Sequence, residues 1–135
     1  MDTVTREQRS EIMRRVRSRD TRPEMMVRRT LHRMGYRFRL HNGRLPGRPD
    51  LVLTRWKVVV FINGCFWHQH AGCPKAARPT TNEMFWNRKL DRNLARDQEN
   101  VSELRKMGWR VLVLWECKIR DERWLQRRLQ SFLRE

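Results

Sequence analysis

Apolar residues at helical spacing divide the amino-terminal part of the chain into two helices. Thr5-Arg6-Glu7-Gln8 and Thr21-Arg22-Pro23-Glu24 have the form of capping boxes, so a helix is expected to begin at each. The second helix should end at Gly35 and place Glu24 in its first turn. The apolar positions are Ile12, Met13 and Val16 in the first helix and Val27, Leu31 and Met34 in the second.

The same spacing predicts two helices in the carboxy-terminal half. A long helix is expected over residues 81–107, before Gly108, and an amphipathic helix over about residues 121–133. Their apolar stripes are Leu90, Leu94, Val101 and Leu104 in the long helix and Trp124, Leu125, Leu129 and Phe132 in the last. Each helix therefore has one face to bury against the rest of the chain.

Short apolar runs between these helices predict strands. Residues 36–40, 49–53 and 57–62 form extended runs separated by turn-forming residues, so they should pair as a meander. Residues 58–62 are apolar without interruption, which indicates a central strand covered on both faces, and residues 110–115 predict another buried strand. The element order predicts an α/β fold with a mixed central sheet flanked by helices.

The charge of the chain indicates an anionic polymer as its partner. The 135 residues contain 31 Lys and Arg against 15 Asp and Glu, a formal net charge of +16. No repeat, low-complexity tract or linker interrupts the sequence, so one domain is expected over residues 1–135. Its basic helix within residues 1–20 would lie on a phosphate backbone.

A membrane or secreted protein is not expected. The sequence has no apolar run of about 18 residues, and its amino terminus lacks the apolar core of a secretory signal. A cytoplasmic location is therefore predicted, associated with the nucleoid if the polymer is DNA. The three cysteines should then be reduced, and Cys/His clusters in such a compartment more often bind metal than form disulfides.

Residues 65–73 contain two thiols and two imidazoles, and Cys117, expected at the end of the last strand, adds a third thiol. Three cysteines and one histidine form a closed tetrahedral site for structural zinc, with either His68 or His70 as the fourth ligand on composition alone. The alternative is that the cysteines are ordinary buried residues. A catalytic zinc is disfavoured because three thiolates reduce its Lewis acidity.

Asp50 precedes the apolar run Leu51-Val52-Leu53, so its carboxylate should lie at a sheet edge beside the end of strand 58–62. A carboxylate there can hold Mg²⁺, which phosphodiester hydrolysis uses to offset charge. Alternatively, Asp50 only ends a Pro-Asp turn. If His70 binds zinc, His68 is left near the metal with a pKa suited to proton transfer.

Four segments together resemble the very-short-patch-repair (Vsr) family of DNA mismatch endonucleases. They are Leu45-Pro46-Gly47-Arg48-Pro49-Asp50, Phe61-Ile62-Asn63-Gly64-Cys65-Phe66-Trp67-His68, Phe85-Trp86, and Gly108 through Trp115-Glu116-Cys117. The resemblance extends from about Met13 to Cys117. It implies a restriction-endonuclease-like fold and nicking of one DNA strand beside a T:G mismatch, which initiates repair of deaminated 5-methylcytosine.

The resemblance also implies roles for individual residues. Asp50 corresponds to the metal-binding aspartate, His68 to the catalytic histidine, and Glu24 to an assisting acid. The structural zinc ligands would be Cys65, His70, Cys73 and Cys117. Asn63 stands where the best-known member has a histidine, so its carbonyl oxygen and the Ile62 backbone carbonyl are expected to complete the magnesium shell.

Aromatic residues near the zinc loop resemble the wedge that the family inserts into the base stack. Phe66, Trp67 and Trp86 would form it, and unstacking costs least where pairing is already faulty. The alternative is that these rings pack in the core around the metal. Lys89, one turn after Trp86, is expected to contact phosphate or the minor groove, or else to be a solvated lysine, and Met13 is a further candidate DNA contact.

The sequence alone leaves three candidate functions. The first is a mismatch-directed nickase acting as a monomer, with mismatch-repair proteins as candidate partners; a mismatch is asymmetric, so one chain suffices. The second is a restriction or defence nuclease with another DNA target. The third is a zinc-stabilised DNA-binding module without catalysis, which the joint presence of Asp50, His68 and Glu24 disfavours.

Overall fold

The computed structural model describes residues 20–134 of the chain. The first predicted helix and Met13 lie outside the described residues. The second predicted helix forms as α2 (Arg22–Arg33), where the Thr21 side chain accepts a hydrogen bond from the Glu24 backbone N–H at 3.4 Å. Gly35 follows its end with φ +88°, a conformation that favours glycine.

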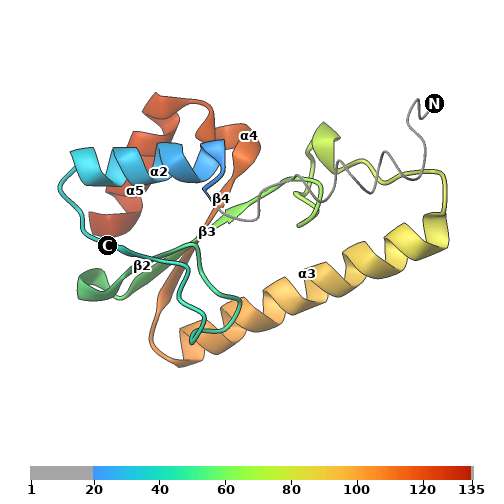
Figure 1. The fold of residues 1–135 in the computed structure, drawn as a ribbon, viewed down its shortest axis with the longest axis horizontal. Helices are drawn as coiled ribbons and strands as arrows, with labels where there is room; N and C mark the ends of the chain where they lie inside the picture. The colour runs from blue at the N-terminus through green and yellow to red at the C-terminus, as the bar shows by residue number, and fades with distance from the viewer. Residues whose placement is uncertain (1–19, 135) are drawn as a thin grey trace.

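Four strands form one mixed sheet in the order β1-β2-β3-β4 (Figure 1). The strands are β1 (Arg39–Leu40), β2 (Leu51–Leu53), β3 (Val58–Asn63) and β4 (Arg110–Trp115). The first three pair antiparallel, as the predicted meander requires, and β4 is parallel to β3. The predicted α/β class with a mixed sheet is therefore confirmed.

Helices cover both faces of the sheet (Figure 1). On one face lie α2, the short α4 (Glu116–Ile119) and α5 (Glu122–Arg134); α3 (Glu83–Lys106) lies on the other. Two 3-10 turns, Thr54–Trp56 and Pro74–Ala76, complete the connections. The predicted long and final helices are thus confirmed within a few residues, whereas α4 was not predicted.

The two-residue alternation of strands divides the core into two clusters. Leu51 and Leu53 of β2 face α2 and α5, whereas Val52 faces α3 with Val59 and Leu104. The larger cluster contains Val27, Leu31, Leu51, Leu53, Val58, Val60, Leu112, Leu114, Ile119, Leu125, Leu129 and Leu133. The predicted burial of β3 on both faces is confirmed.

Two sequence predictions need correction. The run 36–40 forms a strand only at Arg39–Leu40, because the ring of Tyr36 packs edge-on against Trp56 at 4.8 Å and Phe38 packs on the larger core cluster. Cys117, predicted at the end of the last strand, instead lies in α4, since the chain turns into a helix directly after Trp115.

The amino-terminal half of α3 projects beyond the sheet, beside the chain that links β3 to α3 (Figure 1). We call this connection, residues 64–82, the Cys/His loop. Only Val101 and Leu104 of the α3 stripe belong to the α3 side of the core; Leu90 is fully buried outside both clusters. The projecting part of α3 thus carries the Cys/His loop rather than the sheet.

Candidate active site and metal centre

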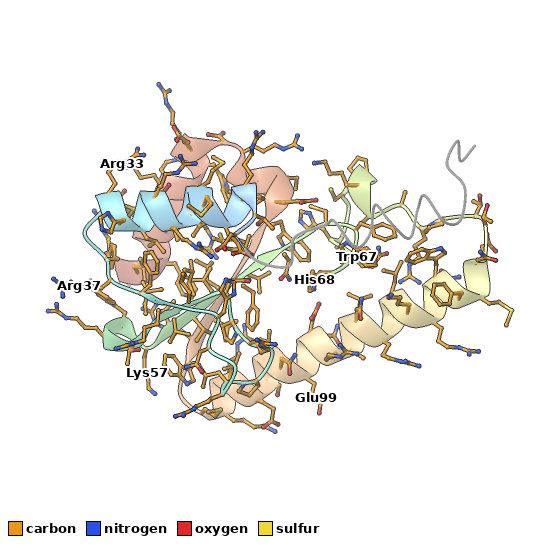
Figure 2. All side chains as sticks on the ribbon, viewed as in Figure 1. Arg33, Arg37, Lys57, Trp67, His68 and Glu99 are labelled. Carbon is orange, nitrogen blue, oxygen red and sulfur yellow. The ribbon has the colours of Figure 1, made fainter. Side chains whose placement is uncertain are left out.

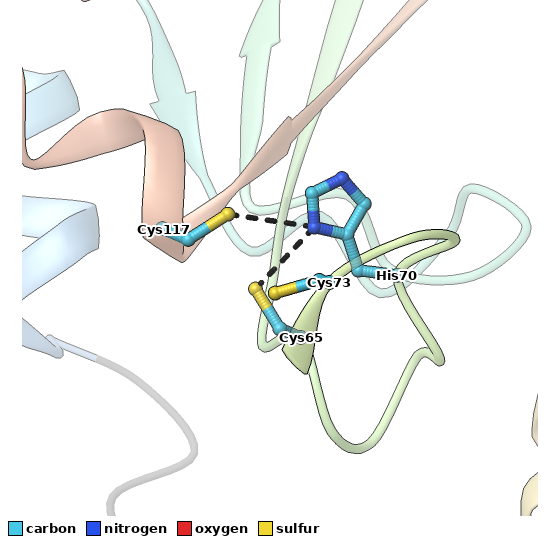
Figure 3. Close-up of side chains that lie close together, drawn as sticks. All are labelled: Cys65, His70, Cys73 and Cys117. Carbon is cyan, nitrogen blue, oxygen red and sulfur yellow. Dashed lines mark hydrogen bonds between the residues drawn. The ribbon is translucent and has the colours of Figure 1, made fainter. Parts of the chain in front are cut away.

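The Cys/His loop and α4 bring four metal-ligating side chains together (Figure 3). The thiols and imidazole of Cys65, His70, Cys73 and Cys117 all lie within 4.8 Å of one another. His70 Nδ1 is 3.6 Å from Cys65 Sγ and 3.4 Å from Cys117 Sγ. Of the two histidines that composition left open, the structure thus places His70 in this cluster.

Neighbouring residues hold the side chains of this cluster in place. The His70 ring stacks on Trp115, with centroids 4.2 Å apart, and Glu116 Oε1 accepts a hydrogen bond from the Cys65 backbone N–H at 3.3 Å. Burial raises the pKa of the Cys65 thiol to about 12. The pKa of the Cys73 thiol is lowered, mainly because the sulfur accepts a hydrogen bond from the backbone of Lys75. Three sulfurs and one imidazole nitrogen at these separations fit a tetrahedral soft-metal site.

His68 points away from that cluster and pairs with an acid on α3. Its Nδ1 lies 2.6 Å from Asp97 Oδ2, and both side chains are about one-third exposed. Figure 2 shows His68 on the Cys/His loop facing α3. A carboxylate only accepts, so His68 Nδ1 carries the proton, and in the neutral ring the opposite nitrogen Nε2 has the lone pair.

Asp50 lies directly before β2, and its carboxylate meets the end of β3. Asp50 Oδ2 accepts a hydrogen bond of 2.7 Å from the Ile62 backbone N–H. Burial, with a smaller contribution from Glu24, raises the pKa of Asp50 to about 6, against the lowering effects of the Ile62 N–H and of His41 and His68. A half-buried carboxylate of this kind gains from a bound cation.

Glu24 reaches the same region from α2 and is 4% exposed. Its Oε2 accepts hydrogen bonds from the Asp20 backbone N–H at 2.9 Å and from Arg28 Nη2 at 2.8 Å. His41, which follows β1, lies 3.4 Å from the same oxygen through Nε2 and 3.9 Å from Asp50 Oδ1 through Nδ1. The two acids are therefore neighbours joined by His41.

A groove of about 750 Å³ opens between α3 and the β3–β4 side of the sheet. Asn63, His68 and Asp97 line one part of it, and Val101, Val113 and Trp115 provide apolar walls. Asn63 is 9% exposed and pairs with Trp115 across the parallel strands. The groove thus joins the predicted catalytic histidine to the end of β3 where Asp50 is held.

The aromatic residues form a cluster of their own. Ring centroids lie 5.1 Å apart for Phe66 and Trp67, 5.6 Å for Phe66 and Trp86, and 6.0 Å for the two tryptophans. Among residues 20–134, neither core cluster includes them, and the adjacent Phe85 is 59% exposed. Lys89 Nζ lies 5.5 Å from the Trp67 ring, so it joins the aromatic cluster. Simple core packing is therefore a poor account of these rings.

Arg78 fastens the Cys/His loop to α3. Its Nε donates to Gln69 Oε1 at 2.9 Å, Nη1 to Asn87 Oδ1 at 3.1 Å, and Nη2 to Asp91 Oδ1 at 2.7 Å. Gln69 in turn donates to the Phe66 carbonyl at 2.7 Å. One guanidinium thus connects the loop that carries Phe66 to the helix that carries Trp86.

The structure gathers Asp50, Glu24, Ile62, Asn63 and His68 around one end of the sheet, and beside it the four cysteine and histidine side chains that could hold a metal ion. Sequence reasoning missed Asp97, Glu116, Arg78, Arg28 and His41. His41 alone had a usable signal, because it directly follows the predicted strand 36–40, which should pair in the same meander as the run 49–53 that contains Asp50. Asp97 is one of many charged residues on the long helix, and nothing in its spacing distinguishes it.

Comparisons with known proteins agree on a nuclease. The profile of the family described as DNA mismatch endonuclease Vsr matches residues 1–75. The type II nicking enzyme V.XorIIP of Xanthomonas oryzae is 45% identical over 98% of this chain and 96% of its own length. The DNA mismatch endonuclease Vsr of Escherichia coli is 42% identical over 83% of this chain and 71% of its own length.

A solved structure supports the fold. The catalytic domain of the homing endonuclease I-Bth0305I superposes with a TM-score of 0.58 over 84% of this chain and 94% of that domain, at 22% identity. Within residues 20–134, no helix combines the length and apolar character needed to cross a membrane.

Proposed function

We propose, on the premise that this chain belongs to the Vsr family of DNA mismatch endonucleases, that it nicks one strand of duplex DNA beside a T:G mismatch. The chain is an endonuclease and its substrate is DNA. The further steps of the proposal are that cleavage needs Mg²⁺ and that the nick initiates repair of deaminated 5-methylcytosine. The net charge of +16 suits a polyanionic substrate.

The observation that carries the proposal is the arrangement of Asp50 and His68. A half-buried carboxylate at the end of β3 lies near enough to His68 for the two charges to interact. His68 is held by Asp97 at 2.6 Å and lines the groove with Asn63. A fixed base beside an acid with a perturbed pKa is the arrangement expected of a hydrolytic site.

In the proposed reaction, His68 accepts a proton at Nε2 from a water molecule. As the water oxygen bonds to phosphorus, one P–O bond of the DNA backbone breaks, and the departing oxygen takes a proton from solvent. Asp97 keeps the Nδ1 proton in place and stabilises the imidazolium that forms. Glu24 supplies a second acceptor near Asp50.

The donor groups fit the two expected metals. Asp50 with the carbonyl oxygens of Ile62 and Asn63 would hold Mg²⁺, which offsets negative charge on the phosphate when bound. The three thiols and His70 would hold zinc, whose role is structural because it fills all four positions with protein ligands. Zinc would thereby fix the loop that carries His68.

Mismatch recognition is assigned to the aromatic cluster. Phe66, Trp67 and Trp86 stand apart from the core, and their faces can stack with bases that a faulty pair releases. Lys89 adds positive charge beside Trp67 for the neighbouring phosphate or groove. Because a mismatch has no twofold symmetry, a monomer suffices.

The test is nicking of end-labelled duplexes that differ only in one T:G or C:G pair, with and without Mg²⁺. We expect the T:G duplex to be nicked on one strand at least about 100-fold faster, and only with Mg²⁺. Equal nicking of both duplexes would leave the endonuclease and remove the mismatch specificity. Asp50→Ala should bind the duplex but not nick it; normal nicking by that variant would refute the active-site assignment.

A further inference from the structure

His41 occupies a position between the two acids of the proposed active site. It follows β1 with φ +46°, and its backbone N–H donates to the Asp50 carbonyl at 3.1 Å. The side chain is 17% exposed. This left-handed backbone conformation lies where β1 stops pairing with β2; it is uncommon for residues other than glycine, although histidine adopts it more often than most.

The two nitrogens of His41 face different acids. Nε2 lies 3.4 Å from Glu24 Oε2, which comes from α2, and Nδ1 lies 3.9 Å from Asp50 Oδ1, at the start of β2. The His41 ring therefore lies between Glu24 on α2 and Asp50 at the start of β2.

Arg28 determines which nitrogen of His41 carries the proton. Arg28 Nη2 lies 2.8 Å from Glu24 Oε2 and 3.2 Å from His41 Nε2. A guanidinium can only donate, and its NH₂ group has two hydrogens, so it donates to both atoms. In the neutral ring, His41 Nε2 is then the acceptor and the proton lies on Nδ1, the nitrogen nearer to Asp50.

A metal ion in place of this arrangement is disfavoured. Asp20, Glu24 and His41 do offer ligand atoms within 4.8 Å of one another. However, Arg28 already lies between the two acids, with Nη1 2.8 Å from Asp20 Oδ1 and Nη2 2.8 Å from Glu24 Oε2. A guanidinium at this place supplies the positive charge that a cation would bring, and it would repel a second one.

We propose that Arg28 and His41 form a positioning pair that couples Glu24 to Asp50 in the active site. Arg28 holds the buried Glu24 carboxylate in one orientation and fixes the tautomer of His41. His41 Nδ1 then lies 3.9 Å from the Asp50 oxygen that the Ile62 N–H does not use, so its contact with Asp50 is electrostatic. Both residues act through the two acids rather than on the DNA. This inference rests on the proposed active site but not on its mismatch specificity.

The first test compares substitutions of His41 under single-turnover conditions. His41→Leu fills the space but cannot hydrogen bond, so nicking should slow by about 10- to 100-fold with an unchanged duplex Kd. His41→Gln can accept from Arg28 and still place a polar N–H group beside Asp50, so it should stay within about threefold of the wild type. Equal rates for the two variants would overturn the proposal. The control is His32→Leu, an exposed histidine on α2.

A double-mutant cycle tests whether His41 acts through Glu24. In the Glu24→Gln background, His41→Leu should slow nicking by less than about threefold, because the coupling between Glu24 and Asp50 that runs through His41 is already broken. The same slowing in both backgrounds would overturn the coupling. If His41→Leu fails to fold, Arg28→Lys is the second test. Lysine is shorter and has one nitrogen where Arg28 uses two, one for Asp20 and one for Glu24 and His41, so about tenfold slower nicking is expected and a wild-type rate overturns the proposal.

These outcomes separate this inference from the proposed function. If Asp50→Ala nicks at the wild-type rate, the active site itself is misplaced. If Asp50→Ala is inactive while His41→Leu nicks normally, only the positioning pair is wrong. If the wild type nicks the T:G and C:G duplexes equally, either duplex serves as the readout for the His41 variants, so loss of mismatch specificity does not affect the result.

Discussion

The sheet and the Cys/His loop both carry residues of the proposed active site, but different forces hold them. Asp50 and Ile62 belong to a sheet whose strands bury side chains such as Leu51, Val58 and Leu112 almost completely. In the loop, Cys65 is the one residue of the range 64–82 that is buried. The sheet is thus stabilised by removal of apolar surface from water, which needs no ligand.

The Cys/His loop is held by polar and metal-ligating groups instead. Its fixed points are the thiol and imidazole cluster, the Arg78 hydrogen bonds and the aromatic contacts with α3. In the proposed site, the acid Asp50 is held by a sheet that folds without a ligand. The base His68 lies in a loop whose position depends on bound zinc. Perturbing one region should leave the other largely intact, and this expectation can be tested.

Removal of a zinc ligand should give the largest effect. Cys73→Ser should lower zinc content below the expected one ion per chain and the free energy of unfolding by about 2 to 5 kcal/mol. Nicking should fall at least about 100-fold, because His68 is close in sequence to His70 and loses its fixed position. Metal analysis, thermal unfolding and single-turnover nicking measure the three quantities.

The matched change in the sheet is Leu112→Ala. Leu112 is 1% exposed, so the cavity should cost about 2 to 5 kcal/mol as well. At low temperature this variant should retain its zinc and its nicking rate. If Leu112→Ala lost zinc, or Cys73→Ser kept both zinc and activity, the two regions would not be separable in this way.

The same contrast explains what the sequence could predict. Strand alternation and helical spacing report apolar burial, so β2, β3, β4 and the helix α3 were predicted within a few residues. The predicted strand 36–40 is shorter in the structure because Tyr36 and Phe38 pack against other parts of the core. The helix α4 has only four residues, too few for a periodic signal. His70 lies in the thiol cluster as expected from its family, whereas Asp97 is brought to His68 from 29 positions away and had no local signal.

On the sheet side, Asp50→Asn should increase stability while it removes activity. In the native state the pKa of Asp50 is about 6, above its ordinary value of 3.8, so folding binds protons between about pH 4 and 6. The stability that protonated Asp50 contributes is lost as pH rises through 6. At pH 7.5 without Mg²⁺, the asparagine variant should be more stable by on the order of 1 to 3 kcal/mol.

This difference should shrink as the pH falls from 7.5 to 5, where wild-type Asp50 becomes protonated. Thermal unfolding at the two pH values measures it, with Glu99→Gln as a control because Glu99 is exposed on α3 (Figure 2). The same difference in stability at both pH values would show that the pKa of Asp50 is not raised in the folded protein. The loop should be unaffected, so zinc content should match the wild type.

On the loop side, Arg78→Met should give the smallest effect. Arg78 is 29% exposed and Asp91 65% exposed, so the loss of stability should be below about 1 kcal/mol. The main effect should be on the position of the Cys/His loop, because Gln69 and the Phe66 carbonyl lose their link to α3. The T:G to C:G nicking ratio should therefore fall by about 3- to 10-fold, with zinc retained. Arg96→Met removes the same charge from an exposed position of α3 and should leave the ratio unchanged; an equal fall in both variants would mean that Arg78 acts only through its charge on DNA.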